Sequence, residues 1–247
     1  MTLVFAVVLA LVAATSFLSG VFGVAGGLIL MGGLLYLLPV SQAMLIHGVA
    51  QFVSNGTRAV VWRKYIAFDV LARFAFTSVL CLGVFALVRF VPSRTLVLFL
   101  LGLSTVILYF VPQRFAPQIT QPAVAYGAGI AGTALMLLAG VSGPFLDQLF
   151  VRSGLDRRAT IATKAAMQCL AHVIKIVYFG ALASQGLDAQ WWGLAAVVPI
   201  ASIIGSSLAA PILARLTDKQ FYWWTRRIVL VLGIYYTVEA MRSWLGS

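Results

Sequence analysis

The sequence predicts an all-α, polytopic integral membrane protein, on the strength of its composition, its long apolar runs and an internal repeat. Of 247 residues, 62% are hydrophobic and only 9% are charged, and the mean hydropathy is +1.03. A soluble domain carries roughly 45–50% apolar and about 25% charged residues. So few charges cannot cover a water-facing surface. The composition therefore excludes a soluble enzyme, a disordered tail and a disulfide scaffold.

Uninterrupted apolar runs recur along the chain, each long enough to cross the hydrocarbon core as a helix of roughly 17–25 residues. They cover 43–62, 68–90, 95–111, 159–180, 191–213 and 221–244. Two further runs, 3–38 and 122–151, are equally apolar but interrupted by helix-breaking residues. The breaks are predicted around Gly20, Gly23, Gly26 and Gly27 in the first run, and around Gly140, Gly143 and Pro144 in the second.

The two interrupted runs are related by an internal repeat with a shift of 117 residues. This shift places Gly23 on Gly140 and Gln51 on Gln168. Each half then consists of one broken or re-entrant helical element followed by three transmembrane helices. We expect transmembrane repeat 1 over 1–117 and transmembrane repeat 2 over 118–247, joined in one integrated unit.

The distribution of Lys and Arg orients this chain, because such residues collect in cytoplasmic loops. The basic segments follow the spans 43–62 and 191–213 and occupy the loop 152–158. All of them lie inside only if each broken element crosses the membrane an even number of times, which gives the two repeats opposite orientations. Inverted repeats with discontinuous helices are typical of secondary transporters. Topology thus explains most of the net charge of +11 without a nucleic-acid partner.

Two spans carry a stripe of polar side chains along one helical face, at steps of 4, 8 and 11 residues in both. The stripes consist of His47, Gln51, Asn55 and Arg58 in the first span, and of Lys164, Gln168, His172 and Lys175 in the second. An ionisable group inside a bilayer costs roughly 2.5–3.5 kcal/mol on insertion scales, and it usually faces a bundle interior or a wet cavity. The duplicated spacing predicts a polar, cationic path between the repeats.

A small oxyanion suits this path, because Lys and Arg only donate hydrogen bonds and neither stripe contains a carboxylate. The glycine breaks add unpaired N–H groups and positive dipole ends at half-helix N-termini. Glycine also lets a ligand approach the backbone closely. In addition to the residues of the two stripes, we expect the substrate to contact Gly23, Gly26, Gly27, Gly140, Ser142 and Gly143.

A purely structural interpretation of these residues also stays open. Gln51 and Gln168 could hold helices together by hydrogen bonds, and the glycines could serve close helix packing. Arg58 and Lys175 could extend to the lipid headgroups from the ends of their spans. Asp147 has no acidic counterpart in the first half, and it either neutralises a nearby cation or carries a proton. We favour neutralisation, because a lone buried carboxylate is rarely tolerated.

The paired glycine-rich breaks, each followed by a Pro or Gly turn, an alanine and a polar span, resemble the sulfite exporter TauE/SafE family. The resemblance is carried by 23–48 and 140–164, and as a two-repeat architecture it extends over nearly the whole chain. It implies transport of small sulfur-containing or organic anions, such as sulfite and sulfonates, across the bacterial cytoplasmic (inner) membrane. His47 and Lys164 depart from the family's usual triplets and favour a more highly charged or more acidic ligand.

We therefore expect a secondary transporter of a small anion that works by alternating access between the two repeats. An anion channel and a non-transporting membrane assembly partner are the alternatives. The sequence shows no nucleotide-binding, metal-ligand or nucleophile–base motif, so we expect no enzyme activity, no cofactor and no metal site. The expected partners are the anion, the lipid bilayer and a coupling proton or ion, with His47 or His172 as proton carrier. A homo-oligomer stays open.

Overall fold

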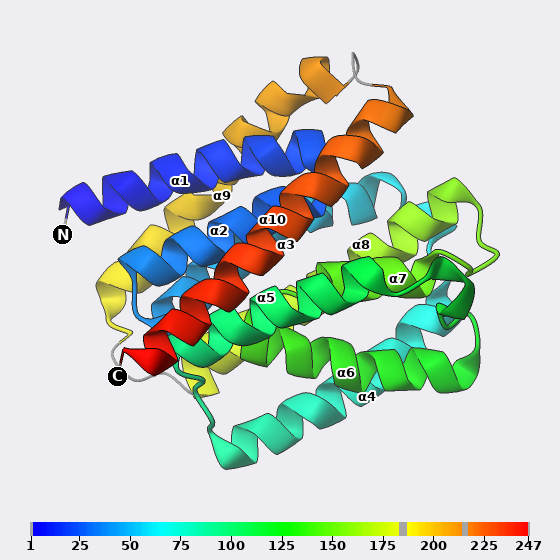
Figure 1. Cartoon of the computed structure of the whole chain (residues 1–247), viewed down its shortest axis with the longest axis horizontal. Coiled ribbons are helices and arrows are strands. Elements are labelled where there is room, and N and C mark those ends of the chain that lie inside the picture. The colour runs from blue at the N-terminus through cyan, green and yellow to red at the C-terminus, as the bar shows by residue number, and fades with distance from the viewer. Residues whose placement is uncertain (1, 183–186, 214–216, 247) are drawn as a thin grey trace.

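The computed structural model describes residues 2–182, 187–213 and 217–246, and over these residues the chain is helical, without a strand (Figure 1). The long helices are α1 (Thr2–Phe22), α2 (Val24–Leu37), α3 (Val40–Val61), α4 (Phe68–Val88), α5 (Arg94–Phe110), α6 (Pro122–Ala139), α7 (Gly143–Phe150), α8 (Arg157–Val177), α9 (Ala189–Leu213) and α10 (Asp218–Leu245). Short helical turns lie at η1 (Arg63–Tyr65), η2 (Gln113–Phe115) and η3 (Tyr178–Leu182).

The helices and their surfaces confirm the all-α membrane class. In the described part of the chain, five helices (α1, α4, α6, α9 and α10) are long and apolar enough to cross a bilayer. Large apolar side chains point outward along them, as Phe76, Ile130 and Ile203 do. Such an exterior suits lipid and not water. The predicted spans 43–62 and 159–180 are the helices α3 and α8, which the polar stripes make less apolar.

The first interrupted run breaks at a single residue, Gly23, between α1 and α2. Its φ of 64° lies in the region that favours glycine. The equivalent residue of the second run, Gly140, has a φ of 78° and ends α6. The break predicted around Gly20, Gly26 and Gly27 is narrower than expected, because those glycines continue the helices. A Cβ on Gly26 would collide with the backbone of Ser19, so this glycine lets α2 fold back against α1.

The helices pack in pairs that join the two halves of the chain. α1 packs on α9, and α4 packs on α6, at opposite sides of the molecule in Figure 1. Between them, α3 packs on α8 and α5 packs on α10. Exchanging the two halves turns the α1–α9 pair into the α6–α4 pair and leaves the two central pairs unchanged. This pattern fits a two-fold relation between the halves, and their opposite orientation in the membrane stays a prediction.

The chain segments that bear on orientation lie where the sequence predicts loops. Residue 117, the expected boundary between the repeats, falls between η2 and α6. Lys64 is exposed in η1, and Arg152 is exposed before α8. Arg215, a basic residue of the segment after 191–213, lies outside the described residues. Lys64 and Arg152 therefore lie between long helices, where cytoplasmic loops would place them.

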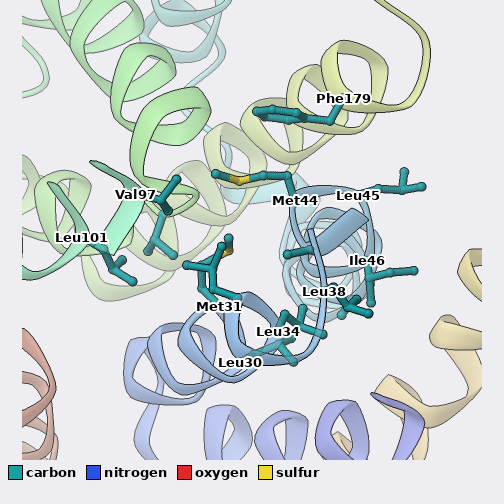
Figure 2. Close-up of a cluster of buried hydrophobic side chains, with 14 of the residues drawn as sticks. Leu30, Met31, Leu34, Leu38, Met44, Leu45, Ile46, Val97, Leu101 and Phe179 are labelled. Atoms are coloured by element: carbon teal, nitrogen blue, oxygen red, sulfur yellow. The ribbon is translucent and has the colours of Figure 1, made fainter. Parts of the chain in front are cut away.

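A cluster of buried apolar side chains joins α2, α3, α5 and η3, as Figure 2 shows. Labelled members of this core are Leu30, Met31, Leu34, Leu38, Met44, Leu45, Ile46, Val97, Leu101 and Phe179. The sulfur atoms of Met31 and Met44 lie against Gly140, so the core packs directly on the second break. Apolar side chains therefore back the second break.

Candidate functional site

A cavity of about 70 Å³ lies between α3, α8 and the two broken elements. It is lined by Gly23, Val24, Gly27, His47, Gln51, Asn55, Arg58, Met136, Val141, Ser142, Gly143, Asp147, Lys164, Gln168 and His172. Both halves of the chain contribute to this wall. A volume of this size holds a few water molecules or one small anion.

The structure brings most of the expected contact residues together in this wall and leaves three outside it. Gly26 faces α1. Gly140 and Lys175 lie behind the wall, where they bond to each other. The four-residue stripe of α3 lines the cavity completely, and the stripe of α8 lines it up to His172. A shared helical face explains this result, because side chains three and four positions apart lie on one side of a helix.

Several buried polar atoms in the wall have no hydrogen-bond partner among the described residues. They are Gln51 Nε2, Ser142 Oγ and His172 Nδ1. Leaving such a group unpaired in a buried place costs about 1–3 kcal/mol. Gln51 Nε2 and Ser142 Oγ can both donate a hydrogen bond, so an acceptor in the cavity would satisfy them.

Two helices begin at the cavity, and neither carries a side-chain cap. α2 starts directly after Gly23, and α7 starts directly after Ser142. The two starts approach each other closely, since a Cβ on Gly143 would lie 2.5 Å from the side chain of Val24. The first N–H groups of a helix point out of its N-terminus and carry a partial positive charge. The cavity therefore faces two positive helix ends.

The charged side chains of the wall are Arg58, Lys164 and Asp147. The Lys164 ammonium forms a half-buried ion pair with the Asp147 carboxylate. This contact confirms the interpretation that Asp147 neutralises a nearby cation. The Arg58 guanidinium donates to Ser54 Oγ at 3.3 Å and lines the same cavity as Asp147. Two cations and one carboxylate thus surround the same small space.

The opposite end of the stripes is closed by a hydrogen-bonded bridge between the halves. Lys175 Nζ lies 2.6 Å from His47 Nδ1 and donates to the Gly140 carbonyl at 2.8 Å. His47 Nε2 lies 3.0 Å from the Gly27 carbonyl. A carbonyl only accepts, so Nε2 donates and Nδ1 accepts from the ammonium. Lys175 is fully buried, so the alternative that it extends to the headgroups is wrong.

The wall also contains residues that sequence reasoning did not assign to the site. Val24, Met136 and Val141 give it an apolar part, and no pattern in the sequence separates them from other apolar residues. Asp147 stood out only as an unmatched acid after the second break. In the described part of the chain, no group of three or more His, Cys, Asp or Glu side chains is placed to hold a metal ion.

Comparison with known proteins supplies the family. The family model described as sulfite exporter TauE/SafE matches residues 7–236, which is nearly the whole chain. No curated protein and no solved structure matched the chain. The breaks, the polar central helices and this match agree, and the chain belongs to the sulfite exporter TauE/SafE family of membrane transporters.

Proposed function

We propose that this protein is a secondary transporter that carries sulfite, an organosulfonate or a related small oxyanion by alternating access between its two halves. The observation that carries the proposal is the composition of the cavity wall. Each half of the chain contributes one uncapped helix N-terminus and one cationic side chain to it. Secondary transporters hold anionic groups at half-helix N-termini in this way. We place the protein in the bacterial cytoplasmic membrane, with its basic segments inside.

The wall presents three features to a bound oxyanion: positive charge, hydrogen-bond donors and a backbone that the anion can approach closely. Arg58 and Lys164 supply charge from α3 and α8, one from each half. Gln51 Nε2 and Ser142 Oγ supply donors that have no partner among the described residues. Hydrogen bonds from charged donors to an anion contribute about 1.5–3 kcal/mol each. Together these groups would bind the anion where the halves meet, so relative motion of the halves changes the side that it faces.

The two ends of the stripes differ in exposure, which favours a carrier over a channel. Lys175 and His47 are buried at one end, while Arg58 and Lys164 are half-buried at the other. A conducting pore needs both ends accessible at once, whereas a carrier opens them in turn. With the basic segments inside, the half-buried end faces the cytoplasm. Opening the far end requires the Lys175–His47 contact to break.

Uptake of labelled sulfite into vesicles that contain the purified protein tests this proposal. We expect Gln51→Ala and Lys164→Gln to reduce uptake by about tenfold or more, because the first removes a hydrogen-bond donor and the second removes a positive charge from the anion site. The matched controls Gln113→Ala and Lys64→Gln change exposed residues of η2 and η1 and should transport like the wild type. Unchanged uptake in both cavity variants would contradict the proposal. Sulfite trapped inside should accelerate entry if the protein is a carrier, and a channel lacks this exchange.

A further inference from the structure

Asp147 is the one carboxylate among the described residues that line the cavity. Three other acids among the described residues are engaged elsewhere. Asp69 pairs with Arg73 on α4, Asp156 caps α8, and Asp188 accepts from backbone N–H groups at the start of α9. A carboxylate in the wall of an anion site works against the ligand, because it repels the anion and occupies a cation that the anion needs.

The ion pair of Lys164 with Asp147 therefore competes with an anion placed between Arg58 and Lys164. A dianion at that position balances the two cations by itself and leaves the Asp147 charge unbalanced beside it. Like charges in a partly buried place favour the neutral form of one of them. A proton on Asp147 removes the repulsion and makes the occupied site electrically neutral.

The two histidines of the wall are poorly placed to take this proton. Both ring nitrogens of His47 are already engaged, with the proton on Nε2 pointing to Gly27. His172 Nδ1 has no hydrogen-bond partner among the described residues, but its ring centre lies 5.8 Å from that of His47, which contacts the Lys175 ammonium. A second proton on either ring would place two positive charges together in a buried site. Asp147, by contrast, directly contacts a cation of the anion site.

The surroundings of Asp147 contain few other titratable groups. Its helix α7 packs on α8, α5 and α6. From α8 the cavity receives Lys164 and His172, and from α3 it receives His47 and Arg58. The titratable residues of α5 and α6 are engaged elsewhere: Arg94 lies over Tyr36, Tyr109 lies under Arg226, and Tyr126 packs on Phe76.

We propose that Asp147 binds a proton when the anion binds, so that the protein takes up a dianionic oxyanion together with one proton. The inference rests on the proposed function. One proton from water joins a carboxylate oxygen of Asp147, and the Lys164 ammonium exchanges that carboxylate for the anion. No covalent bond of the anion forms or breaks. Asp147 is then the site through which a proton gradient drives the anion.

Proton uptake during sulfite binding tests the inference directly. Calorimetric titration of the purified full chain, in two buffers with different heats of protonation, gives the number of protons bound with each anion. The titration is run at an alkaline pH with sulfite, which is chiefly the dianion there, and with sulfate, a dianion too weakly basic to carry the proton itself. We expect the wild type to take up about one proton with either anion, as linkage between two ligands of one site requires. No uptake by the wild type would overturn the inference even without a variant.

Variants assign the proton to its residue. Asp147→Asn should bind sulfite at least as tightly as the wild type and take up no proton, because its side chain cannot accept one. Asp147→Glu should restore the uptake, and the control Asp69→Asn, which breaks the exposed pair with Arg73, should leave it unchanged. Proton uptake that persists in Asp147→Asn, or a loss of sulfite binding there, would overturn the inference. Absence of sulfite binding by the wild type would instead contradict sulfite as the substrate.

Discussion

At the scale of single residues, the central question is how one lysine stays buried in a membrane protein. Lys175 is fully buried, and its described partners are the His47 ring and the Gly140 carbonyl. Neither partner carries a negative charge, so the site is held by hydrogen bonds that polarise one another. Such an arrangement holds the two halves together at one end and can be broken without separating a strong ion pair.

Replacing Lys175 by methionine should loosen the closed end. The Lys175→Met side chain stays long and unbranched, although one atom shorter, and it removes both hydrogen bonds to the other elements. A cysteine at position 44, in a protein without Cys81 and Cys169, should then react faster with a soluble maleimide. The same probe in the Lys64→Met background should remain as shielded as it is in the wild type, because Met44 is fully buried. Equal reactivity in both backgrounds would argue against a gate at this end.

Backbone conformation at the second break gives another prediction for one residue. Gly140 has a φ of 78°, and a Cβ there would lie 2.7 Å from the sulfur of Met31. Gly140→Ala should therefore lower the thermal stability, through about 1–2 kcal/mol of backbone strain plus the clash. Gly154→Ala is the matched control, because Gly154 has a φ of 73° but open space around it. A larger loss of thermal stability in Gly154→Ala than in Gly140→Ala would show that contact with Met31 is not the reason why position 140 requires glycine.

At the scale of helices, glycine allows the outer pairs to pack at short range. Gly129 of α6 faces the backbone of α4 at Phe74, and Gly205 of α9 faces the backbone of α1 at Ala13. Both positions would collide with main-chain atoms if a Cβ were added. Small residues at such contacts let helices associate where no hydrophobic driving force acts between them.

A pair of substitutions two residues apart separates this packing role from helix propensity. Gly129→Ala should destabilise the protein and weaken the α4–α6 contact, because its Cβ would meet the Phe74 carbonyl. Gly127→Ala on the same helix has open space and should be neutral or stabilising by about 1 kcal/mol. Thermal unfolding in one detergent measures both. Equal melting temperatures for the two variants would contradict the packing role.

At the scale of the whole molecule, the predicted orientation can be tested from the two faces of the membrane. Lys64 and Val91 are both exposed and lie at opposite ends of α4. We expect a cysteine at position 64 to react with an impermeant reagent only from the inside, and one at position 91 only from the outside. Labelling of both from the same side would refute the topology.

The sequence by itself determined the membrane class, the positions of the helices and the face of each central helix that lines the cavity. Those properties follow from local composition and from a period of 3.6 residues, which a single segment carries without reference to its neighbours. The tertiary structure alone decided that Lys164 pairs with Asp147 and that Lys175 bonds to His47 and leaves the cavity. These contacts depend on how α7, α3 and α8 pack, because the partners are far apart along the chain.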